Sequence, residues 1–268
     1  MSAKTKSEVQ QIIRRSGNHF HSQVVRLLRG KAWKVLVSPY YSDSFTDKPR
    51  EVDIIAIKSF DLQDTWGDKF GIIDVRLFIE CKYINGESVF WFDEKDMERA
   101  IQRTMVDTGM DEPQKNTAIR KHHYLANIPV AKLFASSRRF GDEYDLWHKA
   151  INQGLNAMVY YQDIYNLIPK SEWEARNTLH YLSYPIIICS SFEGLHQKDM
   201  KDEAILEKIS DPFQLEVNYA YVDRKGDSHR RYFLIDVVSI EKLGEFLSIL
   251  EKTDVGTVQE DISWKRRT

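Results

Sequence analysis

Three charged residues stand inside apolar stretches of the sequence, where charge is costly. Asp53 interrupts the run 52–57, and Glu80 and Lys82 interrupt the run 78–83. Both runs are interpreted as β-strands. Because alternate residues of a strand point to the same face, Glu80 and Lys82 should project together. Charges at such positions must be paired or must bind something that offsets their loss of water.

Two carboxylates on neighbouring strands, with a lysine close by, suit the hydrolysis of a phosphodiester. Asp53 and Glu80 offer the hard oxygen ligands that Mg²⁺ prefers. A bound ion polarises the phosphate and lowers the pKa of its water. Lys82 could orient that water and stabilise the charge that develops on phosphorus. The alternative is structural, a buried ion pair between Asp53 and Lys82 with Glu80 at a sheet edge.

The hydrophobic pattern indicates which elements position these residues. A helix over 19–30 and a strand over 33–37 precede a polar loop at 38–49, and 59–74 is expected to be a loop or distorted hairpin. The other expected helices cover about 9–13, 93–105, 143–165 and 240–252, and the other strands 51–57, 75–83, 130–135, 185–189, 215–222 and 231–238, the last two as a hairpin around Lys225-Gly226. Strands alternating with helices predict an α/β sandwich around a mixed sheet.

The two strand motifs resemble a known family. Residues 50–57 followed by 78–83 are similar to motifs II and III of the PD-(D/E)xK superfamily of restriction-endonuclease-like nucleases. The helix over 17–28 and the start of the next strand at 33–35 are similar to the family's first helix and strand. The resemblance covers about residues 16–105. Its joint signal is fairly specific, although a D…ExK pattern alone is loose.

The resemblance implies a restriction-endonuclease-like α/β/α sandwich whose core is a four-stranded mixed sheet. It implies Mg²⁺, with Mn²⁺ able to substitute, bound by Asp53, Glu80 and the backbone carbonyl of Cys81. The expected activity is that of a Mg²⁺-dependent endonuclease acting on DNA, serving restriction or anti-phage defence. Residues 1–170 would form the nuclease core, and 171–268 a hairpin-helix elaboration packed on the same domain.

One position departs from the family pattern. Many relatives carry a glutamate on the first helix where this chain has His21, and Gln23 lies two residues further on. Both are expected as accessory residues, His21 touching a metal-bound water or a phosphate. An ordinary surface histidine is the equal alternative, and the departure leaves a second metal site open.

A basic N-terminal segment and several scattered side chains are candidates for contact with nucleic acid. Residues 1–34 carry eight lysines and arginines against one acid. The expected phosphate contacts are Arg26, Arg29, Arg50, Arg99, Gln102 and Arg103. A solvated helix face explains the same charges. His122-His123 shows no metal spacing and is expected at the surface, whereas Asp236 is expected to be structural.

Composition excludes several other classes of protein. The chain has 268 residues, a net charge of -2, 42% apolar and 29% charged residues, which is typical of a soluble globular protein. No apolar run approaches a membrane span, and no signal peptide is recognisable. Two isolated cysteines, Cys81 and Cys189, form no zinc motif or disulfide framework. A reduced, cytoplasmic protein is therefore expected, with DNA and no membrane as partner.

Assembly and the rival functions complete the set of expectations. Cutting both strands of a duplex calls for two sites, so a homodimer is expected. Its contact would use the amide-bearing helix around Asn152 and the aromatic residues Tyr219, Tyr221, Tyr232 and Phe233, although core packing also explains the aromatics. One rival is a nuclease-like module that binds nucleic acid or protein without cutting. The other is an interaction module whose segment after Lys170 docks on a partner protein of a defence system.

Overall fold

The computed structural model describes residues 17–43, 48–63, 66–108, 110, 117–136, 144–162, 178–202, 206–222 and 227–265. The helix expected near 9–13 and the turn expected at Lys225-Gly226 lie outside these residues. Among the described residues, no helix is both long enough and apolar enough to cross a membrane.

The elements alternate along the chain much as the hydrophobic pattern indicates. The strands are β1 (Lys34–Val37), β2 (Tyr40–Ser42), β3 (Pro49–Glu51), β4 (Ile54–Gln63), β5 (Lys69–Lys82), β6 (Ser88–Glu94), β7 (Pro129–Ser136), β8 (Thr178–Cys189), β9 (Leu195–Asp199), β10 (Leu206–Lys208), β11 (Phe213–Val222) and β12 (Ser228–Ser239). The helices are α2 (Gly17–Gly30), α3 (Met97–Thr108), η1 (Ala118–Lys121), α4 (His123–Ala126), α5 (Tyr144–Gln162), α7 (Ile240–Ile249), the π-helix η2 (Leu250–Asp254) and α8 (Val255–Lys265).

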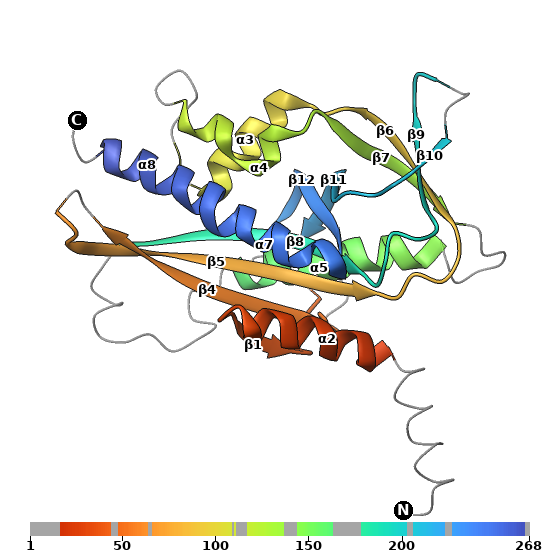
Figure 1. Ribbon diagram of the computed structural model, residues 1–268, viewed down its shortest axis with the longest axis horizontal. Coiled ribbons are helices and arrows are strands. Elements are labelled where there is room, and N and C mark those ends of the chain that lie inside the picture. Colours follow the sequence, from red (N-terminus) through yellow and green to blue (C-terminus); the bar gives the residue numbers. More distant parts are fainter. Residues whose placement is uncertain are drawn as a thin grey trace, which may run out of the picture.

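Ten strands form one mixed sheet in the order β1-β4-β5-β8-β12-β11-β7-β6-β9-β10, and β2 and β3 pair separately. The expected mixed α/β architecture is confirmed at this level. The long β4–β5 hairpin lies at one end of the sheet, and β6, β7, β9 and β10 lie at the other (Figure 1). β8, from the C-terminal part of the chain, is the direct parallel neighbour of β5 from Gly71↔Thr178 to Lys82↔Cys189.

Of the two alternatives expected for 59–74, a loop or a distorted hairpin, the structure has the hairpin, with a register shift between Leu62 and Gln63. β4 continues to Gln63 and β5 begins at Lys69, so the two strands form a longer hairpin than predicted. The polar residues that suggested a loop pair across the two strands. Ser59 Oγ donates to Asp74 at 2.6 Å, and Lys69 forms an ion pair with Asp61. An antiparallel hairpin tolerates such residues because one of its faces can meet water.

The helix expected from residue 93 begins later, at Met97. Residues 88–94 instead form β6, an element that the sequence pattern did not reveal. Asp96 then starts the helix, because its Oδ1 accepts a hydrogen bond from the Arg99 N–H at 3.1 Å. Aspartate is a favoured residue at this capping position. The side-chain cap and the pairing of β6 with β7 together set the boundary.

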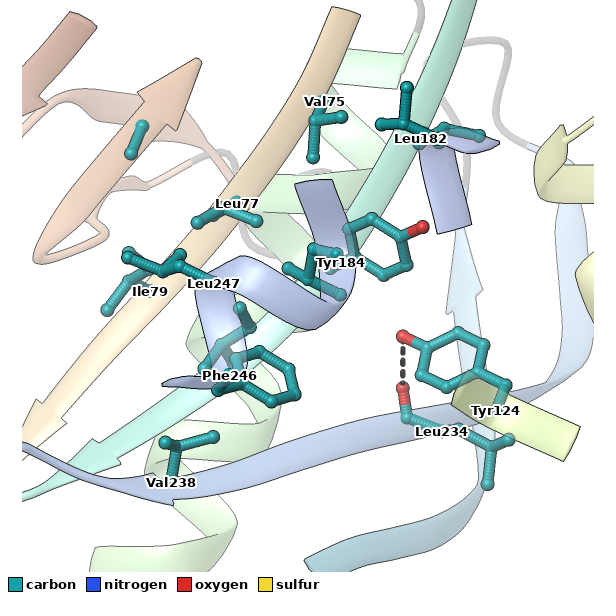
Figure 2. Close-up of a cluster of buried hydrophobic side chains, with 14 of the residues drawn as sticks. Val75, Leu77, Ile79, Tyr124, Leu182, Tyr184, Leu234, Val238, Phe246 and Leu247 are labelled. Atoms are coloured by element: carbon teal, nitrogen blue, oxygen red, sulfur yellow. Dashed lines mark hydrogen bonds between the residues drawn. The ribbon is translucent and has the colours of Figure 1, made fainter. Parts of the chain in front are cut away.

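Two hydrophobic cores cover the two faces of the sheet. On one face, α2, α3 and α7 pack on the even-numbered apolar residues of β4 and the odd-numbered ones of β5, including Ile54 and Ile79. Val75, Leu77 and Ile79 meet Tyr184, Phe246 and Leu247 there (Figure 2). On the other face, α5 packs on the alternate residues, including Ile55 and Phe78. This alternation follows from the two-residue period of a strand and gives a layered α/β/α arrangement.

Two glycines give opposite expectations for substitution by alanine. Gly194 has φ +84°, and a Cβ there would lie 2.5 Å from the Gly86 carbonyl oxygen. Gly154 lies within α5, and a Cβ there would meet nothing closer than Glu80 Cγ at 3.9 Å. We expect Gly194→Ala to lower the free energy of unfolding by about 1–3 kcal/mol and Gly154→Ala to raise it by about 0.5–1 kcal/mol. Urea unfolding of both variants checks this, and equal effects would contradict it.

Candidate active site

The antiparallel register of β4 and β5 brings the three charged residues together. Ile54 pairs with Ile79, so Asp53, one residue before β4, lies opposite Glu80 near the end of β5. Lys82 is the last residue of β5. Glu80 and Lys82 share the strand face that packs against α5, as the two-residue spacing predicts. The site therefore lies where β4 begins and β5 ends.

Hydrogen bonds lock the two strand ends and the three side chains into one cluster. Asp53 Oδ2 accepts from the Cys81 N–H at 2.7 Å, and the Asp53 N–H donates to Glu80 Oε1 at 3.4 Å. Lys82 Nζ donates to Glu80 Oε2 at 2.7 Å and lies 4.0 Å from Asp53 Oδ2. The ion pair considered as a structural alternative thus involves both carboxylates, and Lys82 lies closer to Glu80 than to Asp53.

Glu80 is the most deeply buried member of this cluster. The residue is 1% exposed, and Gly154 of α5 packs over its Cγ. Burial raises the pKa of Glu80 from an ordinary 4.5 to about 7, although the Lys82 ammonium opposes the shift. This carboxyl therefore binds a proton more readily than an exposed glutamate does. A carboxylate in such surroundings gains from any further cation that reaches it.

The other charges of the cluster stay ionised. Burial acts to raise the pKa of Asp53, but the hydrogen bond from His21, the Lys82 ammonium and the Cys81 N–H lower it overall. Burial acts to lower the pKa of Lys82, but the charges of Glu80 and Asp53 raise it overall. Lys82 is therefore an ammonium at neutral pH, and it can stabilise anionic charge but cannot accept a proton.

His21 of α2 reaches the cluster from the opposite helical layer. Its Nε2 lies 3.2 Å from Asp53 Oδ2, and this hydrogen bond raises the pKa of His21, against the effect of burial. The structure thus brings His21 into the site. Gln23, the second accessory candidate, pairs instead with the ring of His19 at 3.3 Å.

The donor atoms at this site fit a hard divalent cation better than a soft one. Ligand atoms of His21, Asp53 and Cys81 lie within 4.8 Å of one another. Burial and the charges of Asp53 and Glu80 raise the pKa of the Cys81 thiol well above its usual value, which disfavours the thiolate that a soft metal needs. The carboxylates of Asp53 and Glu80 are the oxygen ligands that Mg²⁺ or Mn²⁺ takes.

The expected phosphate-contacting residues are spread over both faces of the sheet. Arg26 and Arg29 are exposed on α2, and the exposed Arg50 forms an ion pair with Asp43 at 3.4 Å. Three others lie on α3, which packs on β8 and β12 away from the cluster. Arg99 lies over the Tyr232 ring, Arg103 lies over the Phe233 ring, and Gln102 is exposed. Arg103 is 6% exposed, so little of it can meet a phosphate.

Two residues next to the site were not singled out for chemistry by sequence reasoning. Gln153 of α5 donates from Nε2 to the Glu51 carbonyl at 3.0 Å, two residues before Asp53. Tyr41 of β2 is 3% exposed, and its pKa is raised by burial and by the charge of Glu80. The amide stripe of α5 marked the helix face on which Gln153 lies, but nothing local in the sequence places Tyr41 beside Glu80.

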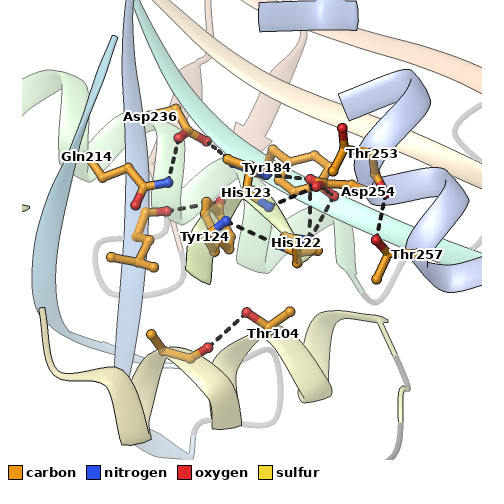
Figure 3. Close-up of polar contacts among 12 residues, drawn as sticks. Thr104, His122, His123, Tyr124, Tyr184, Gln214, Asp236, Thr253, Asp254 and Thr257 are labelled. Atoms are coloured by element: carbon orange, nitrogen blue, oxygen red, sulfur yellow. Dashed lines mark hydrogen bonds and ion pairs between the residues drawn. The ribbon is translucent and has the colours of Figure 1, made fainter. Parts of the chain in front are cut away.

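A second polar cluster lies inside the protein, and it corrects the expectation that His122 and His123 are at the surface. They are 1% and 9% exposed. Asp254 accepts from the His123 N–H at 2.9 Å and forms an ion pair with His123 Nδ1, and Asp236 lies 3.1 Å from His123 Nε2 (Figure 3). The structural role expected of Asp236 agrees with this placement. The π-helix η2, not foreseen, carries Asp254 to the cluster.

Proton positions favour a charge network over a metal centre at this second cluster. The Tyr124 N–H donates to His122 Nδ1, so the neutral ring keeps its proton on Nε2, toward Tyr184 and Asp254. Burial lowers the pKa of His122 to about 4. Carboxylates face both nitrogens of His123, and despite burial they raise its pKa to about 10. Neither ring offers a free lone pair toward Asp254, which a metal would require.

Compared with protein families, with curated proteins and with solved structures, the chain shows no significant match. The geometry of the Asp53, Glu80 and Lys82 cluster is therefore the main ground for assigning a function.

The raised pKa of Glu80 predicts a pH-dependent stability. The carboxyl binds its proton more tightly when folded, so its contribution is greatest below pH 4.5 and falls as pH rises through 7. The measurement is made in the presence of a chelator. Between pH 5 and 8 we expect the free energy of unfolding of wild type to fall by about 2–3 kcal/mol more than that of the Glu80→Gln variant. The exposed Glu98→Gln serves as the matched control. Parallel wild-type and Glu80→Gln profiles would contradict the assignment.

The second cluster predicts unequal roles for two adjacent histidines. His123→Asn leaves two buried carboxylates without their cation and should cost at least about 3 kcal/mol. His122→Asn keeps a residue that can cap Tyr124 and should cost about 1–2 kcal/mol. Because the folded pKa of His123 is raised, its stabilisation is complete below pH 6.5 and is lost as pH rises through 10. Chemical unfolding at pH 6 and 9 measures both costs, and equal costs at pH 6 would refute the charge assignment.

Proposed function

We propose that this chain is a divalent-cation-dependent nuclease of the PD-(D/E)xK type, which hydrolyses phosphodiester bonds of DNA. The observation that carries the proposal is the meeting of Asp53, Glu80 and Lys82 at two paired strand ends. Two carboxylates and an ammonium on adjacent strands are the groups that metal-assisted phosphodiester hydrolysis needs. A role in restriction or anti-phage defence is part of the proposal only through the resemblance of the motifs.

The arrangement around the cluster supports a restriction-endonuclease-like core. β1, β4 and β5 pair antiparallel, and β8 then joins β5 in parallel, which makes a four-stranded mixed unit within the larger sheet. α2 covers one face of this unit and α5 the other. The four strands and two layers correspond to the core that the motifs imply.

Each residue of the cluster has a definite task in the proposed reaction. Asp53 and Glu80 would hold Mg²⁺, with the Cys81 carbonyl as a further ligand. When bound, the ion polarises the phosphate and provides an activated water. The Cys81 N–H holds the Asp53 carboxylate in place at 2.7 Å. Lys82, a permanent ammonium, can bind a phosphate oxygen and stabilise the charge that develops on it.

His21 has a different task from that of the glutamate found in many proteins with similar motifs. It holds a proton at Nε2 against Asp53 Oδ2. A carboxylate at that position would add to the negative charge and favour a second ion, whereas His21 adds none. We therefore expect one tightly held ion at this site rather than two. A protonated His21 can also donate a hydrogen bond to a phosphate oxygen.

One observation favours the second candidate, a nucleic-acid-binding module that does not cut. Glu80 and Asp53 already have hydrogen-bonding partners in Lys82 and His21, so both carboxylates are partnered without any added ion. A site that is complete in this way could serve only to hold the strands together. Binding of an ion separates the two candidates, because only the nuclease needs it.

The central test measures cleavage and ion binding in the same proteins. We expect wild type to cleave plasmid DNA in Mg²⁺ or Mn²⁺ and to be inactive in chelator. Lys82→Ala should lose at least about 100-fold in rate, while Asp53→Asn should lose both cleavage and Mn²⁺ binding in calorimetry. Exposed Lys252→Ala is the control and should behave as wild type. Wild-type cleavage by folded Lys82→Ala would refute the assignment, and folded wild type that neither binds Mn²⁺ nor cleaves DNA or RNA would favour the binding module.

A further inference from the structure

A cavity of about 860 Å³ opens beside the candidate active site. Three separate parts of the chain line it: the β2–β3 hairpin, one face of α5, and the ends of β11 and β12 at residues 219–222 and 228–230. The volume lies within the range of pockets that enclose small organic ligands. Two of the aromatic residues considered for a subunit contact, Tyr219 and Tyr221, are on its wall.

Aromatic rings and amides make up much of the cavity wall. Tyr219 donates from its hydroxyl to Asn156 Oδ1 at 3.0 Å, which leaves the amide N–H groups of Asn156 without an acceptor among the described residues. Tyr221 is 8% exposed and stacks on His229 with ring centroids 5.3 Å apart, so it supports the more exposed His229 ring in the wall. Flat rings bind the faces of nucleobases, and carboxamides pair with their edges.

The cavity wall also carries more positive than negative charge. Lys149, Arg50 and Arg230 contribute ammonium and guanidinium groups, against the single carboxylate of Asp43. Asp43 pairs with Arg50, and no described residue pairs with the Lys149 ammonium or the Arg230 guanidinium. Cations without an internal partner are available for the phosphates of a ligand.

One helix joins the cavity to the active site. Lys149, Asn152, Gln153 and Asn156 follow the spacing of one helical face, and all four line the cavity. Gly154, next to Gln153, packs on Glu80 Cγ, and Gln153 itself is anchored to the Glu51 carbonyl. Tyr41 also connects the cavity to the site. It lines the cavity, and its pKa is raised by burial and by the charge of Glu80. The cavity therefore borders the part of α5 that lies over Glu80.

We propose that this cavity binds one unstacked nucleotide of the nucleic-acid strand that is cut, with the base against the Tyr219 and His229 rings and the amides, and its phosphates toward Lys149 and Arg230. The inference rests on the proposed nuclease function and specifies its substrate as a strand with an unpaired or extruded nucleotide. Bases inside a duplex cannot enter a concave pocket, because stacking and pairing hold them in the helix. Single-stranded segments, ends and flipped nucleotides can enter.

The test uses binding alone, so that it does not depend on cleavage. Fluorescence anisotropy in chelator measures the affinity of the full chain for a labelled single strand of about 12 nucleotides, a length within the range that such sites cover. The affinity for the same strand with abasic units in place of nucleosides shows how much the bases contribute to binding. The double variant Lys149→Ala/Asn152→Ala changes two exposed residues of α5 to the best helix former, which preserves folding. Lys252→Ala, on the opposite face of the sheet, is the charge control.

We expect wild type to bind the base-bearing strand on the order of tenfold more tightly than the abasic one. The double variant should lose on the order of tenfold in affinity for the base-bearing strand and most of the preference for bases, while Lys252→Ala keeps both. Equal affinity of wild type for the two strands would overturn base capture, and an unchanged double variant would overturn the location. Nucleoside monophosphates that bind wild type but not the double variant, with strand binding unaffected, would assign the cavity to a free nucleotide and overturn the strand proposal.

Failure of the nuclease assignment gives a different pattern. A protein that never cleaves, but shows the base preference and loses it in Lys149→Ala/Asn152→Ala, would refute the nuclease and retain the pocket. Cleavage that depends on Lys82, together with equal binding of base-bearing and abasic strands, would retain the nuclease and refute the pocket.

Discussion

The site depends on the burial of one carboxylate, that of Glu80. A carboxylate with 1% exposure is tolerated only because Lys82 Nζ lies 2.7 Å away and the Asp53 N–H faces its other oxygen. Lys82 follows Glu80 by two residues on β5, whereas the Asp53 N–H faces Glu80 only in the observed register, since a shift of one residue would turn Glu80 to the opposite face. The pairing of β4 with β5 therefore fixes the site, and the site in turn constrains the pairing.

The two buried polar clusters contain similar groups but differ in how their charges are balanced. At the Asp254 cluster, His123 carries protons on both nitrogens between two carboxylates, so its charges are balanced and its pKa rises to about 10. At the Glu80 cluster, burial outweighs the single ammonium, and the carboxyl is left with a pKa of about 7. The first cluster joins α4 to η2 and β12, and its role is to stabilise the fold. The second retains affinity for a further cation, which is why we assign the chemistry to it.

α5 links the core, the candidate active site and the cavity. Its apolar face, with Trp147 and Leu155, fills the core beneath the sheet. Gly154 on the same helix lies near Glu80, since a Cβ there would be 3.9 Å from Glu80 Cγ, and the amide face around Asn156 lines the cavity. Because one helix borders both, the cavity and the Glu80 side chain lie on the same side of the sheet.

The sequence by itself determined the local parts: the strand periods of 54–57 and 78–82, the shared face of Glu80 and Lys82, and most helices. These follow from the period of a strand or helix and from the cost of burying charge, which neighbouring residues reveal. The sequence could not place β8 beside β5, Tyr41 beside Glu80, or His122 and His123 in the interior. Each of these depends on partners far along the chain, such as Asp254 for the histidines. Only the tertiary structure decides which distant residues meet, because pairing of strands and burial of polar groups are settled by the whole fold and not by any local pattern.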